Sequence, residues 1–365
     1  MKRFLALFLG LLLTVFPALA EEDEEELLIE EIIEEVEESK SEVLDTDGSA
    51  ILTITCTGDF TIGGDTYHHK DIFTPELNAQ GGDVNFIMQN MRSYFMEDDL
   101  TLVNFEGTLT ETEHVPSNKR NNSFLFSAPP EWVSVLSANG VEAVSLENNH
   151  VMDHGEEGYA DTQQTLSDAG IVWSNSEHIG VFEAKGVQIA MLSYLCIDRY
   201  DSLWDKVPAD IAEAKKYYPL VIVSFHWGNE LDYAPTNNQI KMGRLAVDAG
   251  ADLVIGHHSH RLNPIECYNG VYICYSLGNF CFAGNTKPSD MSSFVFQIRF
   301  RVKDGVCTSR GFRIIPIRIS SRTSRNDFIP TPYTSGANID SVLTTLRSNG
   351  KKLEYAVENY PLDWE

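Results

Sequence analysis

The residues best suited to chemistry are carboxylate, amide and imidazole side chains that directly follow short apolar runs. Asp59 follows the first run and Glu106 the second. A single Asp or His after a strand usually caps the backbone or bonds within a loop. Five strand ends in succession carry such donors and none carries lysine, so a shared site is favoured over capping alone. The set is Asp59, Glu106, Asn149 with His150, His226, and then His257, His258 and His260.

These donor types indicate divalent metal ions. Carboxylate, amide oxygen and imidazole suit Mn, Fe or Zn, whereas the lack of thiolates in the set argues against a structural zinc cluster. His258 and His260 are two residues apart, so in an extended segment they project to the same side and suit two neighbouring ions. A carboxylate such as Glu106 would bridge them. A paired centre of this kind lowers the pKa of a bound water and offsets charge on an attacked phosphoryl or carbonyl group.

Elements that position these donors are predicted from apolar patterning. Nearly continuous apolar runs are typical of strands covered on both faces, and side chains at the carboxyl ends of such strands converge in one crevice of an open α/β sheet. Helical spacing between the runs makes this an α/β protein. Strands are predicted at residues 51–57, 101–105, 141–146, 221–225 and 252–255, and helices at 84–97, 131–139, 159–169 and 239–249, the last three ending at Gly140, Gly170 and Gly250.

After residue 260 the pattern changes to hairpins. Residues 264–268 and 271–275 flank an Asn269-Gly270 turn, and further strands are predicted near 294–302 and 313–319. We find no internal repeat or linker between residues 50 and 320. One domain over residues 50–320 is therefore predicted, with a loosely attached C-terminal tail over residues 321–365.

The N-terminal residues predict export. Lys2 and Arg3 precede an apolar run, and Ala18-Leu19-Ala20 offers a cleavage site, so residues 1–20 are predicted to be a signal peptide cleaved after Ala20; an uncleaved anchor is the alternative. Residues 21–49 form an acidic spacer, with a docked or partner-seeking helix as the alternative.

The net charge limits the classes of binding partner, and the positions of the cysteines predict their oxidation state. The net charge of −27 argues against non-specific binding to nucleic acid or anionic lipid. Residues 21–47 hold 15 acids and one base, so they account for −14 of that charge. The six cysteines lie in apolar runs and are predicted to be buried free thiols, although export would permit disulfides.

The motifs around these donors resemble those of the CapA family, whose members are poly-γ-glutamate capsule biosynthesis proteins. The resemblance covers roughly residues 50–282 and implies a calcineurin-like metallophosphoesterase fold, a sandwich of two mixed β-sheets flanked by helices. The matching motifs, in order, are Gly58-Asp59, Asn104-Phe105-Glu106-Gly107, Asn148-Asn149-His150 with Asp153 and Gly155, His226-Trp227-Gly228-Asn229-Glu230, Gly256-His257-His258-Ser259-His260 and Ser276-Leu277-Gly278-Asn279-Phe280.

The resemblance also implies a role for each residue. One ion would be held by Asp59, Glu106 and His260. The other ion would be held by Glu106, Asn149, His226 and His258. The implied cofactors are thus one or two divalent ions of Mn, Fe or Zn. His150 would protonate the leaving group and Asp153 would orient it; helix capping or a core hydrogen bond is the alternative role for His150.

Two departures from the superfamily pattern concern the first ion. The first motif of the superfamily is Asp-x-His, whereas this chain has Asp59-Phe60-Thr61. Glu106 stands where the superfamily usually has an aspartate. The first ion therefore has fewer ligands, and the site is weaker, empty or completed by a nearby residue such as Asp65, His68 or His69. His257 is ambiguous because the run of histidines aligns in two ways, and the His-x-His pair favours His258. Substrate-pocket candidates, each with packing or loop hydrogen bonding as the alternative, are Trp227, Glu230, Asn279 and Arg261.

Three functions follow as hypotheses. The first is an exported metal-dependent hydrolase-type protein of poly-γ-glutamate capsule biosynthesis or processing, acting on a phosphoester or on the acidic polymer. In the second, a non-catalytic component binds or exports the polymer beside membrane-bound capsule synthase subunits. The third is a secreted metallophosphoesterase with another substrate, because motifs determine fold and metal chemistry better than substrate.

Overall fold

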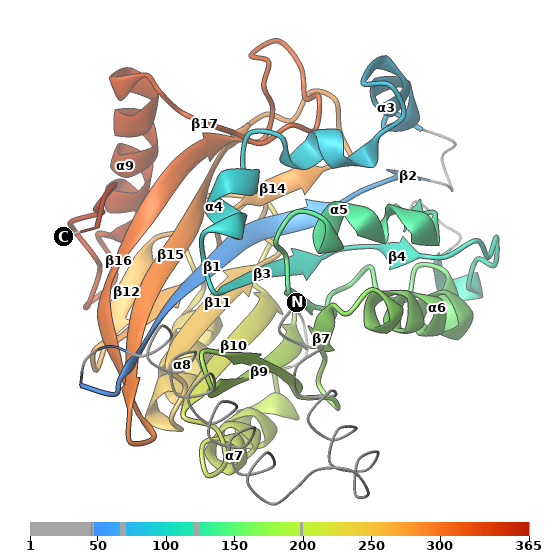
Figure 1. Cartoon of the computed structure of the whole chain (residues 1–365). Helices are drawn as coiled ribbons and strands as arrows, with labels where there is room; N and C mark the ends of the chain where they lie inside the picture. The colour runs from blue at the N-terminus through green and yellow to red at the C-terminus, as the bar shows by residue number, and fades with distance from the viewer. Residues whose placement is uncertain (1–44, 46, 66–70, 120–123, 198–199, 365) are drawn as a thin grey trace, which may run out of the picture. The chain divides into compact units, whose positions relative to one another are not determined.

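The computed structural model describes residues 45, 47–65, 71–119, 124–197 and 200–364 (Figure 1). The chain divides into two units, residues 1–50 and Ile51–Glu365. The predicted signal peptide and nearly all of the acidic spacer lie outside the described residues. Within the described ranges, no helix has both the length and the apolar character needed to cross a bilayer.

The first sheet has eight strands and is mixed. Its path is β17-β16-β15-β1-β3-β6-β7, and β14 pairs with β1 off this path. β1, β3, β6, β7 and β14 run parallel, whereas β15, β16 and β17 pair antiparallel to one another. The bounds are β1 Ala50–Thr61, β3 Leu100–Phe105, β6 Ala143–Ser145, β7 Val172–Ser174, β14 Asn279–Phe282, β15 Ser292–Lys303, β16 Val306–Arg318 and β17 Thr331–Pro332.

The second sheet has six strands in the order β12-β13-β11-β10-β9-β8, with a parallel centre and antiparallel edges. A small third sheet has the order β2-β5-β4. The bounds are β8 Gly180–Ala184, β9 Val187–Cys196, β10 Leu220–Trp227, β11 Leu253–His257, β12 Ile265–Tyr268, β13 Val271–Cys274, β2 Gly64–Asp65, β4 Thr108–Leu109 and β5 Phe126–Ala128.

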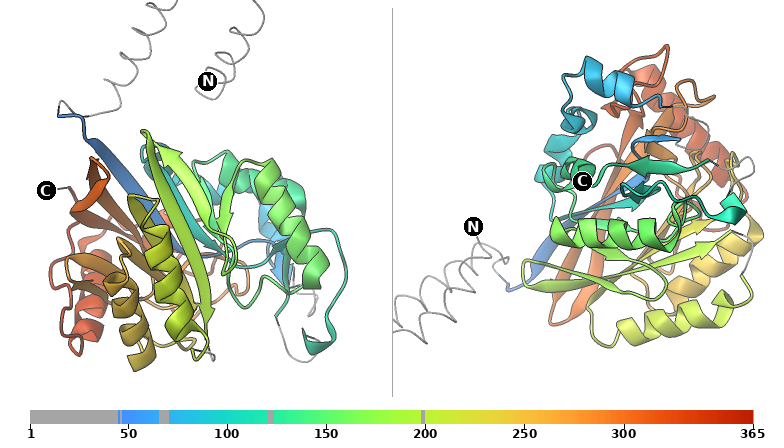
Figure 2. Two further views of the ribbon diagram at one scale, coloured as in Figure 1. Left: turned by 90° about the horizontal axis from the view of Figure 1, so that it is seen from below. Right: turned by 90° about the vertical axis from the view of Figure 1, so that its right-hand side faces the viewer.

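The two large sheets pack face to face between helices, which confirms the predicted α/β sandwich. The ring of Tyr272 in β13 packs against that of Phe312 in β16, with 4.7 Å between the centroids and a tilt of 58°. One apolar cluster packs α6 and the shorter helices on the first sheet, and another packs α7 and α8 on the second (Figures 1 and 2). The bounds are α3 Thr74–Ala79, η1 Val84–Met88, α4 Arg92–Met96, η2 Ser117–Lys119, η3 Pro130–Val133, α5 Ser134–Ser137, α6 Gly155–Asp168, α7 Leu203–Ala214, α8 Asn237–Asp248 and α9 Gly336–Gly350.

The predicted strands and hairpin are confirmed, but two predicted helices are broken. Residues 84–97 form a 3-10 turn and then α4, because the backbone bonds at Gln89 and Met91 reach back three residues instead of four. Residues 131–139 are likewise η3 followed by α5. Gly140, Gly170 and Gly250 all have positive φ, as left-handed caps require.

The C-terminal residues are not a loosely attached tail. Helix α9 buries Val342 and Leu346, and the chain beyond it pairs with the second sheet through Val357 N–H, which donates to Ile265 O at 2.9 Å. Ile314 N–H of β16 donates to Pro361 O at 2.8 Å. This segment therefore covers the edges of both large sheets, and its many polar residues concealed that role in the sequence.

All six cysteines are free thiols, as predicted. Cys56, Cys196, Cys274 and Cys281 are buried, whereas Cys267 and Cys307 are only partly buried.

Two partly buried carboxyls lie beside the start of β3. Thr101 donates its backbone N–H to Glu142 Oε2 at 2.8 Å and its hydroxyl to Asp98 Oδ2 at 2.7 Å. Burial raises the pKa of each carboxyl to about 7, and neighbouring acids add to this shift. Each group therefore holds its proton more tightly in the folded chain than in the unfolded one.

This pKa shift predicts a pH-dependent stability. The stabilisation is present below the ordinary glutamate pKa of 4.5 and is lost as the pH rises through about 7. In Glu142→Gln that loss is absent. We therefore expect similar free energies of unfolding at pH 4.5 and a variant more stable by about 1 kcal/mol at pH 8. Urea unfolding at both pH values measures this, and an equal difference at the two would contradict it.

Candidate metal centre

Strand ends from both large sheets bring the predicted donors together. Asp59 lies near the end of β1 and Glu106 directly follows β3, while His226 lies in β10 and His258 follows β11. Glycine at position 58 lets the backbone before Asp59 lie close to the backbone of Gly278, because any Cβ at position 58 would lie 2.0 Å from Gly278 O. The first sheet thus contributes the carboxylates and the second contributes most of the imidazoles.

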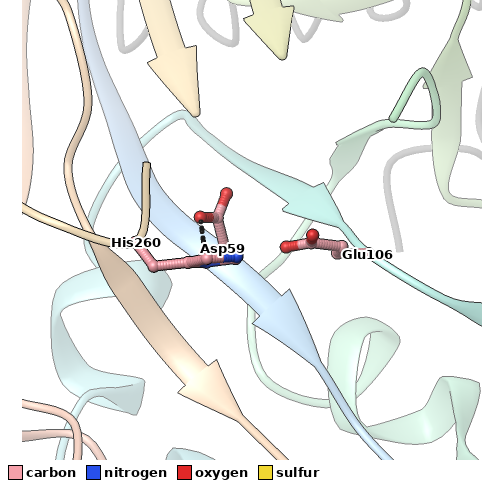
Figure 3. A group of neighbouring side chains, drawn as sticks. All are labelled: Asp59, Glu106 and His260. Atoms are coloured by element: carbon pink, nitrogen blue, oxygen red, sulfur yellow. Dashed lines mark ion pairs between the residues drawn. The ribbon is translucent and has the colours of Figure 1, made fainter. Parts of the chain in front are cut away.

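The centre of the site is a carboxylate pair with one imidazole (Figure 3). Asp59, Glu106 and His260 each present a ligand atom, and these atoms all lie within 4.8 Å of one another. His260 Nδ1 lies 3.0 Å from Asp59 Oδ2 and 2.9 Å from Asn279 Oδ1. Asp59 and Glu106 are essentially inaccessible to solvent.

Further donors surround Glu106. Its Oε1 lies 3.8 Å from His226 Nε2 and 3.9 Å from His150 Nε2. The rings of His226 and His258 are 4.7 Å apart between centroids. His258 and His260 both have positive φ, at 89° and 55°, so backbone strain accompanies the placement of both imidazoles.

Many of these atoms lack partners although they are buried. Among the described residues, neither carboxylate oxygen of Glu106 has a hydrogen-bond partner, nor does Asn149 Oδ1 or His226 Nε2; the same holds for Asp59 Oδ2 and for Nδ1 of His257 and His258. Unpaired buried polar atoms are costly, and clustered acceptors of this kind suit a cation. The donor set therefore fits a divalent metal ion.

Electrostatics within the cluster support the same conclusion. Burial, and then the charge of Asp59, raise the pKa of Glu106 to about 7. Burial alone would lower the pKa of His260, but Glu106 and Asp59 raise it to about 9. Although burial opposes it, the nearby imidazoles of His257 and His260 hold the pKa of Asp59 well below its usual value. The acids thus need compensating positive charge, which a bound cation provides.

Burial keeps the imidazoles of His226 and His258 in the form that binds metals. It lowers the pKa of His226 well below its usual value, and the neighbouring His258 adds to the effect. Burial and then His260 lower the pKa of His258. Neutral imidazole is the metal-binding form.

Two asparagines that we did not single out from the sequence hold the donors in place. Asn104 Nδ2 lies 2.9 Å from Asp59 Oδ1 and 3.3 Å from His226 Nδ1, so it joins the two sheets. Asn148 Nδ2 donates to Phe105 O at 2.8 Å, and its Oδ1 accepts from His150 N–H at 3.0 Å. Their signal was their place in the motifs, one or two positions before a predicted ligand.

His150 lies at the edge of the centre and is held by a buried carboxylate. Its Nδ1 is 2.7 Å from Asp153 Oδ2, which also accepts from Phe126 N–H at 2.8 Å. Lys119 donates to Asp153 Oδ1 at 2.7 Å and to Asn149 O at 2.8 Å. One ammonium group therefore fixes both the Asn149 backbone and the partner of His150.

We expect this ion pair to be strongly stabilising. Asp153 is inaccessible to solvent, so Lys119→Met would leave a buried charge without its cation and cost about 3 kcal/mol of unfolding free energy. Lys216→Met removes an exposed pair with Glu213 and should change stability far less. Urea unfolding compares the two. Equal effects would show that the Lys119 pair behaves as an ordinary surface pair.

The predicted substrate-pocket residues separate into different environments. Trp227 is fully buried, with Nε1 donating to Tyr275 O at 2.9 Å, and therefore belongs to the core. Arg261 is also buried and donates to His260 O and Ser289 Oγ at 2.8 and 2.7 Å. Asn279 contacts His260, and Glu230 alone of the four is exposed. Of the extra donors suggested for the first ion, Asp65 is buried, and His68 and His69 lie outside the described residues.

The geometry defines an α/β sandwich with a candidate metal centre. Two mixed sheets between helices bring carboxylate, amide and imidazole donors together at the ends of strands from both. Residues 53–284 match the bacterial capsule synthesis protein PGA_cap, and the chain belongs to this family.

Individual relatives agree with this assignment. The PGA biosynthesis protein CapA of Bacillus subtilis (strain 168) is 32% identical over 294 residues, which cover 75% of this chain and 73% of that protein. The capsule biosynthesis protein CapA of Bacillus anthracis is 27% identical over 327 residues, covering 82% and 74%. A probable polyglutamine synthesis accessory protein of Mycobacterium tuberculosis is 28% identical over 211 residues, covering 50% and 55%.

Among solved structures, the calcineurin-like phosphoesterase YfkN from Bacillus subtilis is similar with a TM-score of 0.42 and 15% identity. That similarity covers 83% of this chain and 100% of the other.

Proposed function

We propose that this chain is an exported protein of poly-γ-glutamate capsule biosynthesis or processing whose metal centre carries hydrolase-type chemistry. The observation that supports this most is the buried cluster of unpartnered donors around Glu106 with His150 at its edge. Family membership supports the biological context, and the predicted signal peptide supports export.

The roles of the residues follow from their positions. Asp59, Glu106, Asn149, His226, His258 and His260 would hold one or two ions of Mn, Fe or Zn. A divalent ion bound here would activate a water and offset charge on the attacked group. Asp153 orients the imidazole of His150 so that its other nitrogen faces the centre, where it would donate a proton to the leaving group.

One experiment tests both the metal and the chemistry. Metal content of the mature protein is measured after growth in metal-replete medium, and the same preparation is assayed on phosphomonoesters, phosphodiesters and poly-γ-glutamate. We expect stoichiometric Mn, Fe or Zn and turnover of one substrate class, which His226→Ala abolishes. Metal-free protein under these conditions would exclude the catalytic function.

A second candidate function is non-catalytic. A relative named as a synthesis accessory protein favours a component that binds or exports the polymer beside membrane-bound synthase subunits. Stoichiometric metal without turnover, combined with binding of the polymer, would support this function over the first.

A further inference from the structure

His257 lies inside the centre but outside the predicted ligand set. It is the last residue of β11 and stands in register with His226 of β10. The residue is 2% exposed, and its Nδ1 lies 3.3 Å from Asp59 Oδ1. Across the described ranges, this nitrogen has no hydrogen-bond partner. A buried imidazole nitrogen without a partner is costly, so its position beside a carboxylate calls for an explanation.

The two oxygens of Asp59 each face an imidazole nitrogen. Oδ1 faces His257 at 3.3 Å, and Oδ2 faces His260 at 3.0 Å. Two ligand atoms bound to one ion at about 2.0 to 2.2 Å lie about 2.8 to 3.1 Å apart at an octahedral angle and about 3.3 to 3.6 Å apart at a tetrahedral angle. Each of the two distances matches one of these ranges. The spacing therefore allows both imidazoles to share an ion with Asp59.

The ligand set implied for the ion beside Asp59 is also the smaller of the two. Asp59, Glu106 and His260 supply it with three residues, and Thr61 occupies the position two residues after Asp59. Thr61 is fully buried and its Oγ1 has no hydrogen-bond partner among the described residues, but a neutral hydroxyl is a poor substitute for imidazole. His257 approaches the same carboxylate from the second sheet.

We propose that His257 Nδ1 is a ligand of the ion held by Asp59 and His260. With Glu106, this ion then has two carboxylates and two imidazoles, a donor set suited to Mn, Fe or Zn. The inference rests on the metal centre of the proposed function. It adds a ligand that the sequence comparison assigned to no ion.

Two variants separate a ligand from a residue that only orients Asp59. Asparagine places an amide nitrogen near the position of Nδ1, so His257→Asn can still donate to Asp59 while binding metal poorly; His257→Ala can do neither. Chelator-treated protein is titrated with Zn²⁺, bound metal is counted by mass spectrometry, and the absorption of the Co²⁺ form is recorded. We expect both variants to lose one ion and to bind it more than about 100-fold more weakly, beyond the 10- to 100-fold effect of residues that only support a ligand.

The controls make every outcome decisive. His178→Ala alters an exposed imidazole and should retain wild-type metal content. Wild-type affinity in His257→Asn with loss in His257→Ala would overturn the proposal in favour of an orienting hydrogen bond. Loss of the same ion in His68→Ala or His69→Ala, with His257→Ala unaffected, would overturn it as well. Thermal unfolding of the metal-free proteins verifies folding. Wild-type protein that binds no ion would refute the proposed metal centre itself, a result distinct from the other outcomes.

Discussion

Glu106→Gln should abolish metal binding and turnover while leaving the fold intact. Both oxygens of Glu106 are buried without hydrogen-bond partners in the described part of the chain, and Oε1 lies within 4 Å of His226 and His150. A neutral amide cannot supply the negative charge with which Glu106 would hold a divalent ion. We expect metal content to fall from one or two ions to less than about a tenth of an ion per chain, and hydrolysis to become undetectable.

The same substitution should not destabilise the metal-free protein. Burial and then the charge of Asp59 raise the pKa of Glu106, so an amide at position 106 removes a buried group whose ionisation is unfavourable in the metal-free protein. Metal-free Glu106→Gln should therefore unfold at the same temperature as the metal-free wild type or above it. Glu142→Gln is the matched control, because this partly buried glutamate bonds to Thr101 and should keep its metal and activity. Retention of stoichiometric metal in Glu106→Gln would contradict the ligand role proposed for Glu106.

The strand ends were predictable from the sequence because strands buried on both faces are continuous apolar runs. Asp59, Glu106 and His226 interrupt or directly follow such runs, and each lies in the centre. The pairing between sheets was not predictable in this way. Asn104 lies within an apolar strand, where a single polar residue does not by itself indicate a function. In the structure it contacts Asp59 on its own sheet and His226 on the other.

Elements stabilised by tertiary contacts were the least predictable. The residues after 320 have no strong apolar periodicity, and their attachment depends on backbone bonds such as Cys267 N–H to Tyr355 O at 2.9 Å. Residues 84–97 have helical spacing but form a 3-10 helix followed by a short α-helix. Apolar side chains with this spacing can be buried by either type of helix, so the spacing alone did not predict the break. The pairing of Lys119 with Asp153 was not predictable because the two residues are 34 positions apart in the sequence.

His150→Gln should separate proton transfer from metal binding. Its Nδ1 is engaged by Asp153 and its Nε2 lies 3.9 Å from Glu106 Oε1, at the edge of the centre and outside the proposed ligand set. We expect kcat to fall about 10²- to 10⁴-fold, the range of a general acid, while metal content stays at the wild-type value. Assay of the same substrates with Asp153→Asn should show a smaller loss in the same direction, because that residue only orients the imidazole.

Comparing substrates with different leaving groups tests the general-acid role of His150 most directly. An aryl phosphate releases an oxygen of low pKa that needs no proton, whereas an alkyl phosphate or the amide of poly-γ-glutamate releases a strongly basic group. His150→Gln should therefore slow alkyl or amide substrates far more than aryl ones, and a uniform loss would contradict the acid role. If the protein instead only binds the polymer, affinity should survive this substitution, since no proton is transferred. Loss of polymer affinity with an intact fold and full metal content would count against that second function.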